Sequence, residues 1–142
     1  MYQQNTPKTI HVVAAIIFRT APENSSQKQV LATQRGYGEF KGGWEFPGGK
    51  IEADEKPENA LVREIQEELN AKILVKNFVH TIEYDYPNFH LSMKCFECEL
   101  SENQEITLLE HQNAKWLDKK NLYSVDWLPA DVDVLKKVEK LL

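Results

Sequence analysis

Three glutamates, Glu64, Glu67 and Glu68, lie close enough in the sequence to hold a metal ion together. They fall in Pro57–Leu69, the best helix candidate, where residues three and four apart are neighbours. The glutamates then form a stripe that borders an apolar one, consisting of Leu61, Val62, Ile65 and Leu69. Like charges at these spacings cost about 0.2–0.5 kcal/mol per pair. The pattern therefore indicates either a site for a divalent cation or a solvated acidic helix face.

A Pro47-Gly48-Gly49 turn precedes this helix. Glycine has no Cβ, so a ligand can come close to the backbone here. Because Mg²⁺ prefers oxygen ligands, a carbonyl of this turn could complete a site that the glutamates begin.

The spacing of Gly49, Glu55 and the run Arg63-Glu64-Ile65-Gln66-Glu67-Glu68 resembles the Nudix box. The glycine expected after Leu69 is Asn70, which also tolerates the left-handed conformation. The segments "VVAAII", "WEFPGGKIE", "EHQ…W" and "LPAD" occur in the order seen in MutT-like enzymes, and the likeness is greatest to CTP pyrophosphohydrolases. The resemblance implies an α/β (α+β) Nudix fold, with a mixed β-sheet in an α/β/α sandwich.

The resemblance also implies roles for single residues. Glu64, Glu67 and Glu68 would bind Mg²⁺ or Mn²⁺, joined by the Gly48 carbonyl and by Glu110 from a late loop. Glu64 resembles the family's general base, with Glu110 as the alternative. Arg63 would orient the glutamates by ion pairing, and Glu110 could also be only a solvated loop residue.

On the substrate side, Arg35 matches a phosphate-contacting arginine, although a solvated strand-end arginine is the alternative. Glu45, Phe46 and Pro47 match the segment that lines the nucleotide pocket. Asp131 would read the base edge, as an acceptor for cytosine or, if protonated, as a partner for an oxidised purine. It could also be the N-cap of the last helix.

These residues need a framework of strands. In residues 11–18, odd- and even-numbered positions are both largely apolar, which predicts a strand covered on both faces. A polar hairpin loop is expected over residues 21–29, and a glycine-rich loop over 36–43. Further strands are expected over residues 30–35, 72–86, 89–100 and 113–117, and a closing helix over 127–142.

The 142 residues fit a single domain, 1–142, and the net charge of −5 argues against general binding to nucleic acid or a membrane surface. No basic segment precedes the apolar run of residues 12–18, which is too short to cross a bilayer, so a cytoplasmic location is expected. Cys95 and Cys98 would point to opposite faces of a strand and stay reduced. The protein is expected to be a monomer or a homodimer that binds a small nucleotide.

The function that these features indicate is metal-dependent hydrolysis of a nucleoside triphosphate to a monophosphate and pyrophosphate. The substrate would be CTP, dCTP or an oxidised nucleotide such as 8-oxo-dGTP. Two alternatives stay open: a Nudix hydrolase for a nucleotide sugar or dinucleotide, and a non-catalytic nucleotide-binding Nudix module.

Overall fold

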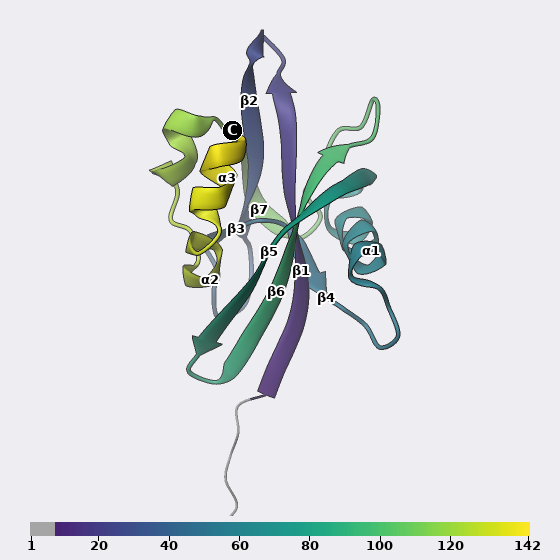
Figure 1. Ribbon diagram of the computed structural model, residues 1–142, viewed down its shortest axis with the longest axis vertical. Coiled ribbons are helices and arrows are strands. Elements are labelled where there is room, and N and C mark those ends of the chain that lie inside the picture. Colours follow the sequence, from purple (N-terminus) through teal and green to yellow (C-terminus); the bar gives the residue numbers. More distant parts are fainter. Residues whose placement is uncertain (1–7) are drawn as a thin grey trace, which may run out of the picture.

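The long strand β1 (Lys8–Ala21) runs through the middle of the computed structural model, which describes residues 8–142 (Figure 1). Both of its faces are buried. Ala14, Ile16 and Phe18 belong to one hydrophobic cluster, whereas Val13, Ala15 and Ile17 belong to a second. The alternation confirms a strand covered on both sides.

Within the described residues, seven strands form one mixed sheet. β1 pairs in parallel with β6 and antiparallel with both β2 and β4, so it is the branching point of the sheet. The outer pairs, β5 with β6 and β7 with β2, are antiparallel. The remaining strands are β2 (Asn24–Arg35), β3 (Trp44–Glu45), β4 (Gly48–Lys50), β5 (Ile73–Tyr86), β6 (Phe89–Leu100) and β7 (His111–Leu117).

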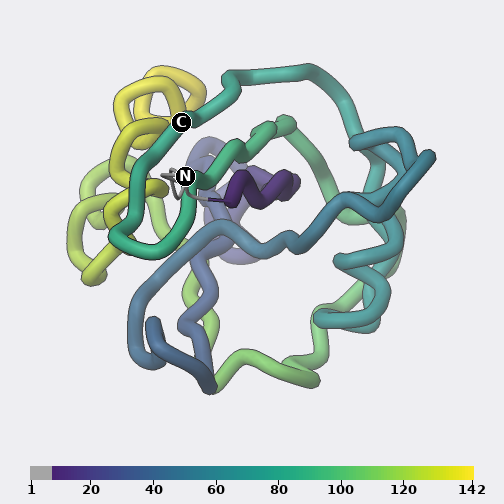
Figure 2. The backbone as a smooth tube through the Cα atoms, turned by 90° about the horizontal axis from the view of Figure 1, so that it is seen from below, coloured from purple at the N-terminus to yellow at the C-terminus, as the bar shows by residue number. Residues whose placement is uncertain are grey.

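Helices cover the sheet from both sides. The helix α1 (Pro57–Leu69) lies on one side, and α2 (Pro129–Val132), α3 (Leu135–Leu141) and the 3₁₀ helix η1 (Lys119–Ser124) lie on the other. Figure 2 shows the same two groups from below, separated by β1. This arrangement confirms the expected α/β/α sandwich with a mixed sheet.

The helix α1 has the bounds that the sequence predicts. Pro57 begins it, where a missing N–H does no harm, and Asn70 ends it in the left-handed conformation, with φ 49° and ψ 43°. Leu61, Ile65 and Leu69 are fully buried. Val62 was expected on the same stripe, but it is 39% exposed, because it lies at the edge of the helix face that packs on the sheet.

Two predicted elements were wrong. The polar loop over residues 21–29 is mostly strand, because β1 and β2 continue as a ladder to a turn at Pro22 and Glu23. The single helix over residues 127–142 is instead two helices, α2 and α3, which a turn at Asp133 and Val134 separates.

The two cysteines are free and buried on opposite faces of β6, as the strand alternation predicts. Cys95 packs in the cluster beneath α2 and α3, and Cys98 in the cluster beneath α1. Because the two thiols lie on opposite faces of the strand, they do not face a common partner, and burial raises the pKa of the Cys98 thiol to about 12.

No helix within residues 8–142 is long and apolar enough to cross a membrane. The expectation about the segment before the apolar run also concerns residues 1–7. These residues lie outside the described part of the chain.

Candidate active site

A cavity of about 690 Å³ opens between the glycine turn, α1, the β5–β6 hairpin and α2. It brings together residues that are far apart in the sequence. All of the predicted site residues except Pro47 line it, namely Arg35, Glu45, Phe46, Gly48, Arg63, Glu64, Glu67, Glu68, Glu110 and Asp131. Pro47 is buried instead, and its carbonyl accepts a hydrogen bond from the Ala15 N–H at 2.7 Å.

The two glycines of the turn are needed for different reasons. A Cβ on Gly48 would lie 2.9 Å from Ala14 Cα and closer still to the Val13 carbonyl, which is backbone that cannot move away. A Cβ on Gly49 would lie 2.8 Å from Glu64 Oε1 and closer to Oε2. Gly48 therefore lets β4 pair with β1, and Gly49 makes room for the Glu64 carboxylate.

The carbonyl of Gly48 is available to a ligand. In the antiparallel pairing of β4 with β1, Pro47 bonds to Ala15 and Ile51 bonds to His11. Antiparallel ladders alternate bonded and non-bonded pairs, so Gly48, opposite Ala14, falls at a non-bonded position. Its carbonyl then points away from β1.

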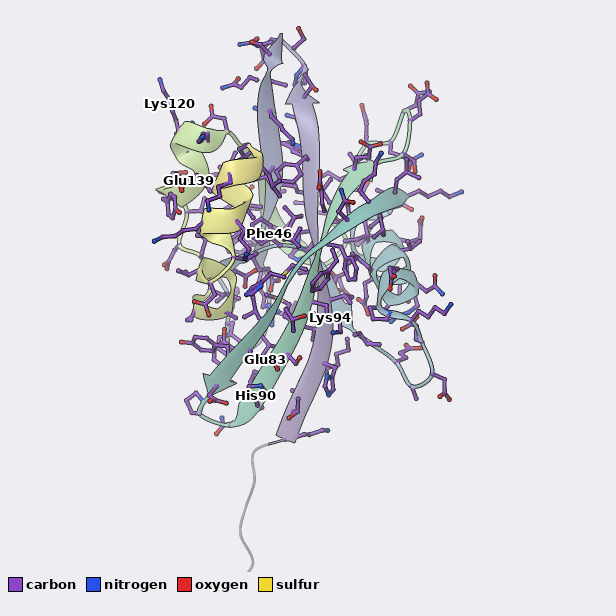
Figure 3. The ribbon with its side chains drawn as sticks, viewed as in Figure 1. Phe46, Glu83, His90, Lys94, Lys120 and Glu139 are labelled. Carbon is purple, nitrogen blue, oxygen red and sulfur yellow. The ribbon has the colours of Figure 1, made fainter. Side chains whose placement is uncertain are left out.

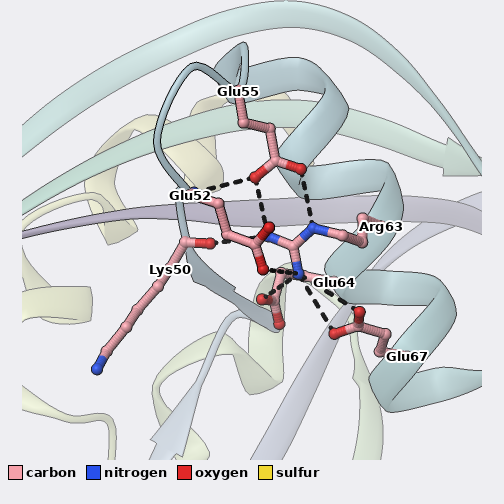
Figure 4. A network of polar contacts seen from close by, with 6 residues as sticks. All are labelled: Lys50, Glu52, Glu55, Arg63, Glu64 and Glu67. Atoms are coloured by element: carbon pink, nitrogen blue, oxygen red, sulfur yellow. Dashed lines mark hydrogen bonds and ion pairs between the residues drawn. The ribbon is translucent and has the colours of Figure 1, made fainter.

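Arg63 ties the carboxylates of the Nudix-like segment together (Figure 4). Its Nε lies 2.8 Å from Glu55 Oε2, and its Nη1 lies 2.9 Å from Glu64 Oε1 and 3.3 Å from Glu67 Oε2. Its Nη2 also donates to the Lys50 carbonyl at 3.0 Å. The hydrogen bond from Arg63 lowers the pKa of Glu55 to about 2. The expected orienting role of Arg63 thus has a geometric basis.

Glu68 is the least satisfied carboxylate of the cluster. Its side chain is 13% exposed, and its Oε2 is buried with no hydrogen-bond partner among residues 8–142. Burial, with the nearby charges of Glu64 and Glu110, raises its pKa to about 8. Burial also raises the pKa of Glu64, against the effect of Arg63. An unpaired buried carboxylate oxygen is costly, and a bound cation would remove that cost.

The carboxylates are gathered but are not yet in coordinating positions. Within residues 8–142, no group of three or more His, Cys, Asp or Glu side chains could hold a metal ion as it stands. In this arrangement Arg63 pairs with Glu64 and Glu67, and Glu110 is an exposed loop residue. The donors themselves suit a hard divalent cation, since all are oxygens and one of them is orphaned.

Arg35 is held at the cavity by Glu45. The two make a bidentate pair, with Nη2–Oε1 at 2.7 Å and Nε–Oε2 at 3.2 Å. Burial alone would raise the pKa of Glu45, but hydrogen bonds from His111 and Arg35 outweigh it and lower the pKa. Arg35 is therefore not a free, solvated arginine, although 36% of its side chain stays exposed.

Sequence reasoning gave no role to His111. Its side chain is only 6% exposed, and its Nε2 lies 3.4 Å from Glu45 Oε2 and 3.9 Å from Glu68 Oε2. It therefore lies between the Arg35–Glu45 pair and the acidic cluster. The sequence offered one signal for His111, its position next to Glu110 in "EHQ". That motif does not show that the His111 side chain is buried.

Asp131 lines the cavity and is 4% exposed. Its Oδ2 accepts a hydrogen bond from the Phe46 N–H at 2.9 Å, and burial raises its pKa to about 8. The N-cap alternative was wrong, because Leu128 is the N-cap of α2 and Val134 that of α3. Asp131 instead lies inside α2.

Comparisons with known proteins bear on the family of this chain. The family model described as NUDIX domain matches residues 10–138. The CTP pyrophosphohydrolase of Escherichia coli (strain K12) is 31% identical over 141 residues, which cover 91% of this chain and 90% of that protein. The 8-oxo-dGTP diphosphatase of Proteus vulgaris is 36% identical over 90 residues, covering 63% and 75% of the two chains.

Solved structures give the same result. The E. coli ORF135 protein superposes with a TM-score of 0.77 at 30% identity, covering 95% of this chain and 91% of that one. MutT from methicillin-resistant Staphylococcus aureus 252 superposes with a TM-score of 0.73 at 33% identity, covering 96% and 100%. With the family match over residues 10–138, the chain belongs to the Nudix domain family, whose hydrolases generally use divalent metal ions.

Proposed function

We propose that this protein is a Mg²⁺- or Mn²⁺-dependent nucleoside triphosphate pyrophosphohydrolase that releases a nucleoside monophosphate and pyrophosphate. The observation that carries the proposal is the buried Oε2 of Glu68, which has no hydrogen-bond partner among residues 8–142, at the wall of a cavity that Arg35 and Asp131 also line. The cavity thus offers carboxylates for a metal, a cation for phosphate and a buried acid for a base. The names of the relatives support the same class of substrate.

Five groups would hold the metal: the carboxylates of Glu64, Glu67, Glu68 and Glu110, and the carbonyl of Gly48. When bound, the ion neutralises polyphosphate charge and lowers the pKa of a coordinated water. Arg63 would keep Glu64 and Glu67 within reach of the ion, since it balances part of their charge. This explains how a cluster of like charges is tolerated on one helix.

The protein supplies the base and the phosphate contact. Glu64 is the favoured general base, because burial raises its pKa towards the working range and Arg63 fixes its carboxylate. Glu110 is the alternative, from the loop before β7. Arg35 would contact the phosphates through its exposed edge, while Glu45 holds the other edge.

Asp131 would select the base. Because its pKa is about 8, it is protonated near neutral pH and can donate a hydrogen bond as well as accept one. Since Oδ2 accepts the hydrogen bond from Phe46, Oδ1 would be the oxygen that contacts the nucleobase. A protonated carboxylic acid suits a nucleobase that offers a hydrogen-bond acceptor, such as the extra carbonyl of an oxidised purine. CTP and dCTP stay candidate substrates, because the same acid can also accept a hydrogen bond.

A substrate panel tests the proposal. Pyrophosphate release is measured with CTP, dCTP, 5-methyl-dCTP and 8-oxo-dGTP, and monophosphate release with a nucleotide sugar, each with Mg²⁺ and with EDTA. We expect turnover of at least one triphosphate, abolished by EDTA, and slow turnover of the nucleotide sugar. Faster cleavage of the nucleotide sugar, or no metal-dependent turnover of any triphosphate, would reject the assignment. A triphosphate substrate would also place the protein in the cytoplasm, where these nucleotides are made.

A further inference from the structure

Tyr86 lies where three separate parts of the cavity wall meet. Its ring packs at 5.0 Å on Phe40, from the glycine-rich loop over residues 36–43, and stacks at 5.1 Å on Phe89 across the β5–β6 hairpin. Its hydroxyl reaches a third part, because it accepts a hydrogen bond from the Ala130 N–H in α2 at 3.3 Å. All three of these aromatic residues line the cavity.

The hydroxyl of Tyr86 does what a helix cap normally does. The first N–H groups of a helix have no partner within it, and α2 has no side-chain cap of its own at Leu128. Ala130 is 1% exposed, so without Tyr86 its N–H would be buried and unpaired. The next residue in α2 is Asp131, whose carboxylate bonds to the Phe46 N–H.

We infer that Tyr86 is a positioning residue for base selection: its hydroxyl fixes the first turn of α2, and with it Asp131, against Phe46 and the aromatic wall. This inference rests on the proposed function, because it deepens the part that Asp131 plays there. Its physical basis is that the first turn of α2 is tied to the strand side of the cavity by two hydrogen bonds, from the Ala130 N–H to the Tyr86 hydroxyl and from the Phe46 N–H to Asp131. The N-cap residue Leu128 adds a bond to the Trp44 carbonyl, but that bond lies before the turn that carries Asp131. Loss of either hydrogen bond lets the Asp131 carboxyl move relative to the nucleobase of the substrate.

The hairpin that carries Tyr86 has its own support on the opposite face. There, His90 Nδ1 lies 2.6 Å from Asp85 Oδ1 and His90 Nε2 lies 3.2 Å from Glu83 Oε1. Figure 3 labels His90 and Glu83 near the turn of this hairpin. The hydroxyl of Tyr86 takes no part in these contacts. A Tyr86→Phe substitution should therefore leave the hairpin and the ring packing intact.

The test compares Tyr86→Phe with Tyr84→Phe. Tyr84 is the matched control, because it packs on Tyr86 at 4.8 Å in the same strand but does not line the cavity. For the preferred triphosphate we expect Tyr86→Phe to raise KM about tenfold, the equivalent of about 1.4 kcal/mol, with kcat within about twofold. The kcat/KM ratio between preferred and rejected bases should fall by a similar factor, and Tyr84→Phe should change neither.

A double-mutant cycle separates positioning from general damage. If Tyr86 acts through Asp131, Tyr86→Phe should cost no further selectivity in an Asp131→Asn background. Fully additive losses of selectivity, or an equal fall in kcat for every base, would overturn the inference. Unchanged KM and selectivity in Tyr86→Phe would also overturn it.

Measurements of binding in the absence of turnover test this inference separately from the proposed function. Calorimetric Kd values are measured for cytidine, uridine, guanosine and 8-oxoguanosine monophosphates in the absence of metal. We expect a base preference in the wild type that Tyr86→Phe reduces about tenfold. Wild-type protein that binds all four equally would overturn the inference, whereas a preference without any pyrophosphate release would overturn the proposed function alone.

Discussion

The substitution Gly49→Ala tests whether the position of the Glu64 carboxylate governs activity. The new Cβ would lie 2.8 Å from Glu64 Oε1, whereas ordinary van der Waals contact begins at 3.4 Å. The carboxylate must therefore move by at least 0.6 Å, the difference of these two distances, and by more at Oε2, which is closer. Because it is the end of a flexible side chain, it can move while α1 and β4 stay in place.

The expected loss is in kcat rather than in stability. Misplacement of a catalytic group by about 1 Å can cost about 100-fold in rate, so we expect a fall in kcat of roughly 10- to 100-fold. The free energy of unfolding should change by less than about 1 kcal/mol, as for glycine replacements at unstrained positions. Pyrophosphate release at saturating substrate and Mg²⁺ gives kcat, and urea unfolding gives stability.

Gly48→Ala is the matched control, because its Cβ would collide with the backbone of β1 instead of a side chain. It should destabilise the protein by several kcal/mol, beyond the range of most single substitutions. Wild-type kcat in folded Gly49→Ala would refute the reasoning about Glu64. A loss of stability in Gly49→Ala as large as that in Gly48→Ala would refute the separation of the two roles.

Three further outcomes are expected. The pKa of Asp131 is raised from 3.8 to about 8, so its contribution to stability is fully present below pH 3.8 and is lost as the pH rises through 8. Stability should fall across this range by at most about 1.4 kcal/mol per pH unit, and urea titrations of Asp131→Asn should show a flatter profile; equal slopes would contradict the assignment. Arg63→Met should lower both the unfolding temperature and kcat, the latter at least about tenfold, since the acidic cluster loses its shared cation; unaltered thermal scans and rates would show that the network is incidental. Because Cys95 and Cys98 are buried on opposite faces, a reductant should shift neither activity nor unfolding temperature, and a shift in either would point to a disulfide.

Much of the fold follows from local signals in the sequence. The helix α1 begins and ends where Pro57 and Asn70 predict, because both act through the backbone conformation of their own residue. The two-sided burial of β1 follows from apolar residues on both parities. The carboxylate cluster was also predictable, since Glu64, Glu67 and Glu68 share one helix and the helical repeat alone brings them together.

The rest depends on contacts between distant residues. The Phe46–Asp131 hydrogen bond and the Tyr86–Ala130 bond each join segments that no local pattern connects. The break between α2 and α3 at Val134 has no glycine or proline to mark it, and the apolar spacing runs on through it. The first half of β2, residues 24–29, is polar and pairs with β1 through its backbone. Its side chains therefore do not show the alternation of apolar and polar residues that predicts a strand.

The most direct test of the central claim is pyrophosphate release by Glu68→Gln as a function of Mg²⁺ concentration. Glu58→Gln is the control, because Glu58 is exposed in the first turn of the same helix. If the buried Glu68 carboxylate completes a metal site, Glu68→Gln should lose at least about 100-fold in kcat, remain folded and need more Mg²⁺ for half its maximal rate, while Glu58→Gln behaves as the wild type. Wild-type turnover and Mg²⁺ dependence in Glu68→Gln would contradict the account.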